Sequence, residues 1–242
     1  MAKKNTRQNE RSKLMCRIGP NLDFASNEAY NLLRTNLSFS LPDKVGGKII
    51  GITSSAPQDG KSTTSINLSY SLAEAGHKVI LIDSDMRRPS ISKVLDAPIS
   101  PGLSNVLVGD NDENAIRVGI LHKNLSVLFA GDIPPNPSEL VSSEKMKNTL
   151  ESLKSKYDYV IIDLPPTNLV SDPLAVSKFV DGIIVVVRHE KTKKQEILET
   201  IRQLKFVGVR ILGFVYNGYK RGKGHYYSSD TYYKQSSSTK NK

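Results

Sequence analysis

The segment SSAPQDGKST, residues 54–63, decides the fold of this chain. It follows the apolar run at residues 49–52 and precedes a helical pattern. A strand, a loop ending in Gly-Lys-Ser and a helix are typical of a phosphate-binding loop. Backbone N–H groups of such a loop surround phosphates, while Lys61 adds a mobile cation and Ser62 a hydroxyl ligand for Mg²⁺. The sequence therefore predicts nucleotide contacts from Pro57, Gln58, Asp59, Gly60, Lys61, Ser62 and Thr63.

Two further strand ends support this interpretation, which needs support because Ser55 stands where the motif has its first glycine. The run VILI at 79–82 leads into Asp83 and Asp85, and the run YVII at 159–162 leads into Asp163. In an open parallel sheet, ligands bind beyond the carboxyl ends of the strands, and hard oxygen ligands suit Mg²⁺. A lone aspartate at a strand end is often only a cap or turn residue. Three of them beside a phosphate loop predict a metal site at Ser62, Asp83, Asp85 and Asp163, with Lys61 and the same three acids as the catalytic groups.

Length and composition bound the class of protein. A chain of 242 residues is long enough for one sizeable α/β domain, and nothing in the sequence indicates a second core. No apolar segment approaches the roughly 18 residues of a membrane span, and the basic N-terminus lacks the apolar run of a secretory signal. The single cysteine, Cys16, excludes an internal disulfide framework and a metal cluster built from the cysteines of one chain. We therefore expect a cytoplasmic protein.

The net charge of +10 belongs to the two ends of the chain. Residues 1–17 hold six Lys or Arg and one acidic residue, and residues 219–242 hold the same numbers, whereas residues 18–218 carry 22 of each sign. Basic tails commonly contact anionic membrane surfaces or nucleic acid. A solvated tail that only keeps the protein soluble explains the charge equally well, so both interpretations stay open.

The pattern of apolar residues predicts an alternation of helices and strands. Hydrophobic periodicity indicates helices at 26–40, 61–76, 138–156, 172–179 and 192–206. Apolar runs indicate strands at 48–53, 79–84, 125–130, 159–163, 183–187 and 210–216, with loops and short helices over 86–124. Such alternation predicts an α/β fold with a mostly parallel sheet that helices cover on both faces.

The composition changes abruptly after Asn217. Aliphatic residues disappear, so the segment cannot bury enough apolar area to offset its ordering entropy. We therefore expect a basic N-terminal arm at 1–25, a nucleotide-binding domain at 26–218 and a mobile tail at 219–242. Aromatic residues are unusual in a mobile tail. This tail nevertheless holds Tyr219, Tyr226, Tyr227, Tyr232 and Tyr233.

These motifs together resemble those of the bacterial tyrosine kinases (BY-kinases) that regulate capsular and extracellular polysaccharide synthesis. The resemblance covers nearly the whole chain and rests on APQDGKST, LIDSDMRRP, AGDIPPNPSELVSS, VIIDLPP and the C-terminal tyrosine cluster. It implies a P-loop NTPase fold like that of the deviant-Walker ATPases, unlike the eukaryotic protein kinases. It also implies ATP and Mg²⁺ as cofactors, Lys61 as the Walker lysine, Ser62 as the magnesium-binding hydroxyl, and motif acids at Asp83, Asp85 and Asp163.

The resemblance further implies partners and a cellular location. The split form of these kinases is cytoplasmic and works with a separate transmembrane activator, so recruitment of this chain to the inner face of the cell membrane is expected. Its subunits are expected to form a homo-oligomeric ring. In that ring the tail of one subunit enters the site of its neighbour and is phosphorylated on its tyrosines. A cognate tyrosine phosphatase would reverse the reaction, and nucleic acid is not an expected partner.

Two positions depart from the family pattern. The oligomerisation helix of the family often reads E-x-x-R-x-x-R, and here Glu28, Asn31 and Arg34 occupy those places. An exposed ion pair is worth at most about 1 kcal/mol, so the missing middle arginine weakens assembly but does not exclude it. In the loop, Gln58 stands where glycine is common. Glutamine would be strained there if the backbone needs a positive φ.

The kinase interpretation has two alternatives. A partitioning or positioning ATPase of the deviant-Walker group carries a signature lysine five residues before the Walker lysine, where this chain has Ala56. Such a protein would hydrolyse ATP without phosphorylating any protein. A scaffold that controls polysaccharide length by binding alone is the second alternative, and the intact Lys61 with its three acids argues against it.

The sequence leaves three roles open. The base that accepts the phenol proton is Asp83 or Asp85, and Asp83 is preferred. Arg87 and Arg88 support the acids, contact phosphate or form structural ion pairs. Asn217 follows a predicted strand, so its amide either reads the purine edge of the nucleotide or is a turn residue.

Overall fold

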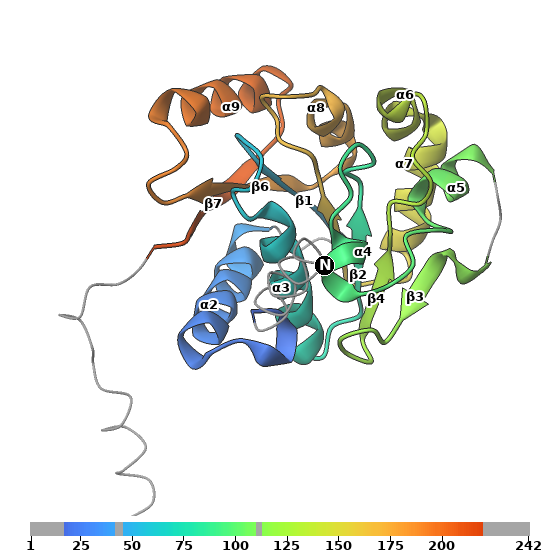
Figure 1. Ribbon diagram of the computed structural model, residues 1–242, viewed down its shortest axis with the longest axis horizontal. Coiled ribbons are helices and arrows are strands. Elements are labelled where there is room, and N and C mark those ends of the chain that lie inside the picture. Colours follow the sequence, from blue (N-terminus) through green and yellow to red (C-terminus); the bar gives the residue numbers. More distant parts are fainter. Residues whose placement is uncertain (1–16, 42–45, 110–112, 220–242) are drawn as a thin grey trace, which may run out of the picture.

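A seven-stranded sheet forms the centre of the computed structural model, which describes residues 17–41, 46–109 and 113–219 (Figure 1). The strand order is β3-β4-β2-β5-β1-β6-β7. Every neighbouring pair is parallel except β3 with β4. The predicted α/β fold with a mostly parallel sheet is therefore confirmed.

Continuous apolar runs explain the parallel strands, because a strand covered on both faces needs no alternation of polar residues. All residues of β2 and β5 are buried. The strands are β1 (Lys48–Ser54), β2 (Val79–Asp83), β3 (Ile116–Val118), β4 (Leu125–Leu128), β5 (Tyr159–Asp163), β6 (Gly182–Arg188) and β7 (Ile211–Asn217). The antiparallel strand β3 was not predicted. With only three residues, none of them buried, it is too short to show a strand pattern.

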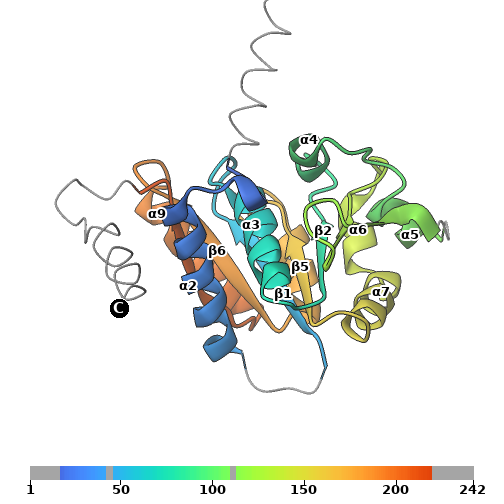
Figure 2. The same cartoon turned by 90° about the horizontal axis from the view of Figure 1, so that it is seen from below.

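Helices cover both faces of the sheet, as predicted, and each face has its own apolar core. One core includes residues of α2 (Phe24–Ser40), α3 (Lys61–Glu74) and α4 (Ile91–Leu95). The other includes residues of α5 (Leu103–Val108), α6 (Pro137–Ser142), α7 (Glu144–Lys154), α8 (Asp172–Val176) and α9 (Lys194–Phe206). Figure 2 shows α2 beside α3, and the two helices are in contact.

Two predicted helices are each divided. The segment predicted as one helix at 138–156 forms α6 and α7, because Ser143 between them has extended backbone angles. The Ser143 side chain accepts a hydrogen bond from the Met146 N–H and so caps the second helix. Likewise, the segment at 172–179 is α8 followed by the 3₁₀ turn η3 (Ser177–Phe179). A capping serine inside a periodic pattern is the signal that marks the first break.

The start of the domain lies before the predicted boundary at residue 26. The 3₁₀ turn η1 (Gly19–Asn21) precedes α2, and the Gly19 N–H donates to Asn67 Oδ1 of α3 at 2.9 Å. Ile18 is buried in the core. Residues 1–16 of the predicted arm and residues 220–242 of the predicted tail lie outside the described part of the chain. Within the described residues, no helix is both long and apolar enough to cross a membrane.

Candidate active site

The candidate site lies at the carboxyl ends of three adjacent strands. In the strand register, Asp83 of β2 pairs with Asp163 of β5, and Asp163 also pairs with Ile52 of β1. The phosphate-loop segment follows β1 and ends where α3 begins at Lys61. The parallel order β2-β5-β1 therefore brings the predicted loop and the predicted acids to one edge of the sheet, where ligands of such folds bind.

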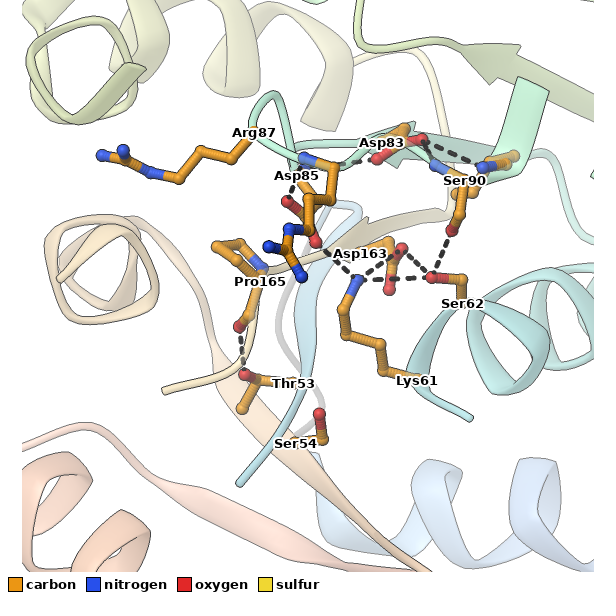
Figure 3. Close-up of polar contacts among 12 residues, drawn as sticks. Thr53, Ser54, Lys61, Ser62, Asp83, Asp85, Arg87, Ser90, Asp163 and Pro165 are labelled. Carbon is orange, nitrogen blue, oxygen red and sulfur yellow. Dashed lines mark hydrogen bonds and ion pairs between the residues drawn. The ribbon is translucent and has the colours of Figure 1, made fainter. Parts of the chain in front are cut away.

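Lys61 is the centre of the site (Figure 3). Its Nζ lies 3.0 Å from Asp85 Oδ2 and 3.3 Å from Asp163 Oδ2. Burial disfavours the charged amine, but the carboxylates of Asp163, Asp85 and Asp83 outweigh burial and raise the pKa of Lys61 above its ordinary value. The side chain therefore stays positively charged at neutral pH and is available as a fixed cation.

The Asp163 carboxylate accepts hydrogen bonds from three side chains. Its Oδ2 accepts from Ser62 Oγ at 2.6 Å and from Lys61 Nζ at 3.3 Å, and its Oδ1 accepts from Ser65 Oγ at 3.0 Å. The carboxyl is fully buried, and burial raises its pKa against the opposing effect of Lys61 and the hydroxyl donors. These bonds fix the orientation of the Ser62 hydroxyl.

Asp83 and Asp85 have different surroundings. Asp83 is fully buried, and three backbone N–H groups donate to its carboxyl, from Asp85 at 3.2 Å, Ser90 at 3.3 Å and Ile91 at 3.1 Å. Burial and then the charge of Asp163 raise the pKa of Asp83 to about 7. Asp85 remains slightly exposed and accepts one backbone N–H, from Arg88, besides its ion pair with Lys61.

The donor chemistry fits a magnesium ion that arrives with phosphates. In the described residues, no group of three or more His, Cys, Asp or Glu side chains is arranged to hold a metal by itself. Mg²⁺ keeps several waters and uses one or two carboxylates together with substrate phosphates, so it does not need such a cage. The Ser62 hydroxyl beside Asp163 is a hard-oxygen pair of the kind it uses.

Ser90 is a site residue that the sequence interpretation missed. Its Oγ donates to Ser62 Oγ at 2.9 Å, and its N–H donates to Asp83. It therefore joins the predicted metal-binding hydroxyl to a predicted metal-binding acid (Figure 3). The available signal was its place just after DSDMRRP, where a serine precedes the short helix α4.

The phosphate loop has the backbone that its sequence suggests. Gln58 has a φ of 63°, so glutamine does occupy a left-handed position there. Gly60 has a φ of 98°, a backbone conformation that strains any residue with a Cβ, and a Cβ at this position would also displace the Asn217 amide, whose Nδ2 lies 1.9 Å away. The Asn217 amide donates to the carbonyl of Asp59 at 2.8 Å. The structure thus places Asn217 against the loop, and its predicted contact with the purine stays a prediction.

The two arginines of the second motif differ. Arg87 points away from Lys61 (Figure 3) and forms an ion pair with Asp172, with 3.0 Å between Nε and Oδ2. Its Nη2 also donates to Ser138 Oγ at 2.7 Å, which links the β2 loop to α6 and α8. This geometry supports the structural ion pair among the open roles of Arg87. The backbone of Arg88 contacts Asp85, and its side chain is exposed.

The predicted oligomerisation residues lie on α2. Glu28 accepts from the Asn31 side chain at 3.0 Å, within the helix. Arg34 Nη1 donates to the carbonyl and the hydroxyl of Ser71 at 2.6 and 3.0 Å, so it is bound to α3 of its own subunit. Of the predicted phosphorylation sites, Tyr219 packs edge-on against His189, with 5.3 Å between ring centroids. The others, Tyr226, Tyr227, Tyr232 and Tyr233, lie outside the described residues.

Known proteins with a similar sequence and structure first establish the class of fold. The family described as AAA domain matches residues 47–210. The septum site-determining protein MinD of Pyrococcus horikoshii, solved in complex with Mg-ADP, has a TM-score of 0.61 and 30% identity, covering 73% of this chain and 72% of that one. The chain is a P-loop ATPase-like α/β protein.

More similar proteins define the family. The tyrosine-protein kinase YwqD of Bacillus subtilis is 36% identical over 86% of this chain and 89% of its own length. The chimerical protein CapA2B2 has a TM-score of 0.79 and 34% identity, covering 86% of this chain and 91% of that one. The chain belongs to the bacterial tyrosine-protein kinases, as expected. It spans only 28% of the length of another relative, the tyrosine-protein kinase ptk of Acinetobacter johnsonii.

Proposed function

We propose that this protein is an ATP-dependent protein tyrosine kinase that phosphorylates its own C-terminal tyrosines between subunits and thereby regulates capsular or extracellular polysaccharide synthesis and export. The observation that carries the proposal is the buried Lys61 between Asp85 and Asp163, beside the hydroxyl of Ser62. Membership of the tyrosine-protein kinase family and the Mg-ADP complex of the MinD relative support the cofactors ATP and Mg²⁺.

Each residue has a role that follows from phosphoryl transfer. The transition state carries charge on the phosphate oxygens, and preorganised cations stabilise it. Lys61 is such a cation, because its carboxylate neighbours hold it charged and in place. Mg²⁺, when bound, would neutralise the same oxygens, with Ser62, Asp163 and Asp83 or Asp85 as its protein-side partners. Residues 58–63 of the loop bind the phosphates through their backbone N–H groups, since Pro57 has no N–H to donate.

The proton of the incoming tyrosine needs an acceptor, because its ordinary pKa is about 10. Between the two candidates, the geometry favours Asp85 over the initially preferred Asp83. Asp83 is fully buried and its carboxyl is engaged by three backbone donors, whereas Asp85, although also buried, keeps 5% of its surface exposed and accepts only one backbone donor. Asp85 is therefore the acid that a phenol entering from solvent meets first.

The proposed partners follow from the relatives. The name of the chimerical protein CapA2B2 joins a CapA part to a CapB part, and a relative from Staphylococcus aureus is named as the putative tyrosine-protein kinase CapB. This pairing supports a second protein, a membrane-bound activator, which would recruit this kinase to the inner face of the membrane. A homo-oligomeric ring and a cognate phosphatase complete the proposal.

Intact mass after incubation with ATP and Mg²⁺ tests the function. A ladder of added phosphates on the chain is the expected result, and mapping should place them on the tail tyrosines. The likeness to MinD makes a switch ATPase the second candidate, although the chain has Ala56 in place of that group's signature lysine. ATP consumption without protein phosphate would contradict the kinase and support that candidate.

A further inference from the structure

Three consecutive carbonyls of the phosphate loop are bound from outside by side chains of two other segments. Arg188 ends β6, Lys191 lies in the loop after it, and Asn217 ends β7. Lys191 Nζ donates to the carbonyl of Pro57 at 2.6 Å, Arg188 Nη1 to that of Gln58 at 3.2 Å, and Asn217 Nδ2 to that of Asp59 at 2.8 Å. We call these three donors the carbonyl clasp.

The clasp itself rests on a compact turn. The N–H of Arg188 donates to Thr192 Oγ1 at 2.8 Å, and the N–H groups of Lys191 and Thr192 donate back to the carbonyl of Arg188 at 3.3 and 3.0 Å. The His189 N–H donates to the carbonyl of Asn217 at 2.9 Å, which joins this turn to the end of β7. The backbone that carries the three donors is therefore held together by hydrogen bonds of its own.

The direction of a carbonyl decides the direction of the next amide. In a trans peptide the C=O and the following N–H point opposite ways. Holding the carbonyls of residues 57–59 on the outer side therefore turns the N–H groups of residues 58–60 to the inner side. Those are the donors with which a phosphate loop binds an anion.

The loop needs such support because its backbone conformation is energetically unfavourable. Gln58 is in the left-handed region, which a residue with a Cβ adopts only at an energetic cost. Asp59 is fully buried, and its Oδ1 has no hydrogen bond within the described residues, but Lys191 Nζ lies 3.7 Å from it. Lys191 thus compensates a buried carboxylate as well as a carbonyl.

We infer that Arg188, Lys191 and Asn217 are positioning residues that hold the strained phosphate loop in its anion-binding conformation. The inference rests on the proposed function only in that the anion is the phosphate chain of a nucleotide. The hydrogen bonds that all three side chains donate to the loop go to its carbonyls and not to the phosphate-binding side of the loop. They act through the backbone of residues 57–59, and two of them also add positive charge beside the loop.

Contacts of exposed side chains often contribute little free energy. The test must therefore separate the carbonyl clasp from surface contacts that have no effect on the loop. Lys191→Met and Arg188→Met remove the donors while keeping an unbranched, largely aliphatic side chain, and Lys194→Met removes a neighbouring exposed charge at the start of α9. The probe is a fluorescent ADP with Mg²⁺, whose Kd is measured without any phosphoryl transfer. The two clasp variants should bind about three- to tenfold more weakly, with Lys194→Met unchanged. Arg188→Lys, which keeps a donor, should recover most of the affinity. Equal Kd values in all variants would overturn the inference.

A second background makes the test specific to the strain at Gln58. Gln58→Gly removes the cost of the left-handed backbone, so the loop should need the clasp less. In that background, Lys191→Met should weaken ADP binding by less than twofold. The same loss in both backgrounds would show that Lys191 acts only through its charge, which overturns the positioning role.

A wild-type protein that binds ADP but adds no phosphate to tyrosine contradicts the proposed kinase and leaves the inference about the carbonyl clasp unaffected. A wild-type protein that binds no ADP contradicts both.

Discussion

Asp83 and Asp163 are register partners at the ends of the adjacent parallel strands β2 and β5, and both carboxyls are fully buried. Two buried acids at neighbouring strand ends repel each other unless a cation or a proton intervenes. Lys61 supplies the cation from the start of α3, and its Nζ contacts Asp163 at 3.3 Å. The site is therefore built to receive positive charge.

Lys61→Met should abolish tyrosine phosphorylation. Loss of one preorganised cation from a phosphoryl transition state typically costs about 10²–10³ in rate. Phosphate incorporation by intact mass measures the effect, circular dichroism checks the fold, and Lys194→Met is the surface control. A folded Lys61→Met protein with normal autophosphorylation would contradict the assignment of the site.

Asp85→Asn should lower the phosphorylation rate by about 10²–10⁴ without a comparable change in ADP affinity, because loss of a general base affects the chemical step.

Asp163→Asn should instead raise the Mg²⁺ concentration needed for half-maximal activity, because it removes charge beside Ser62. Rates measured across a Mg²⁺ titration separate the two effects. Wild-type rates in Asp85→Asn would return the base role to Asp83.

Ser90→Ala should raise the Mg²⁺ requirement for ADP binding, because it removes the donor that orients Ser62 Oγ at 2.9 Å. Ser90→Thr keeps the hydroxyl and is the matched control. Calorimetric titration of ADP with and without Mg²⁺ gives the comparison. We expect a several-fold loss only in the presence of Mg²⁺; an equal loss without the metal would mean that Ser90 acts on the loop and not on the metal shell.

The contribution of Asp83 to the stability of the nucleotide-free protein should fall as the pH rises from about 4 to 7. Burial raises the pKa of Asp83 from its ordinary value of 3.8 to about 7, so in this range the folded state holds a proton that the unfolded state has released. One such proton changes the free energy of unfolding by at most about 1.4 kcal/mol per pH unit. Urea unfolding gives the free energy of unfolding at each pH in this range. The slope of that free energy against pH should be less negative for Asp83→Asn than for wild type or for the exposed control Asp132→Asn. Identical slopes would contradict the raised pKa.

Phosphorylation of the tail should loosen the assembly. Residues 219–242 hold six basic residues and one acidic residue, and each phosphate adds about −1.5 to −2 charges at pH 7. Three phosphates therefore cancel or reverse the tail charge, and a tail attracted to a neighbour's acidic site would be repelled. Mass by light scattering should fall after ATP treatment. The control carries phenylalanine at Tyr219, Tyr226, Tyr227, Tyr232 and Tyr233, and equal masses for both proteins would contradict the switch.

The sequence by itself determined the class of fold and the centre of the site. Buried strands appear as unbroken apolar runs, and a phosphate loop after one of them fixes where ligands bind, so Lys61, Asp83 and Asp163 could be placed together from local patterns alone. The family pattern drew attention to Gln58, where glycine is common, but it left the backbone there open, and the structure shows the positive φ of 63°. Local patterns failed where elements were short, as with β3 and the break at Ser143.

Only the tertiary structure decided which side chains hold these groups in place. The contact of Arg188 with Gln58 joins residues 130 positions apart, and that of Arg87 with Asp172 joins residues 85 apart. Whether a polar residue reaches such a partner depends on the register of the sheet and on the direction of the side chain at the end of its strand or helix. Those directions are set by packing across the whole domain, whereas a motif records only the spacing of residues along one segment.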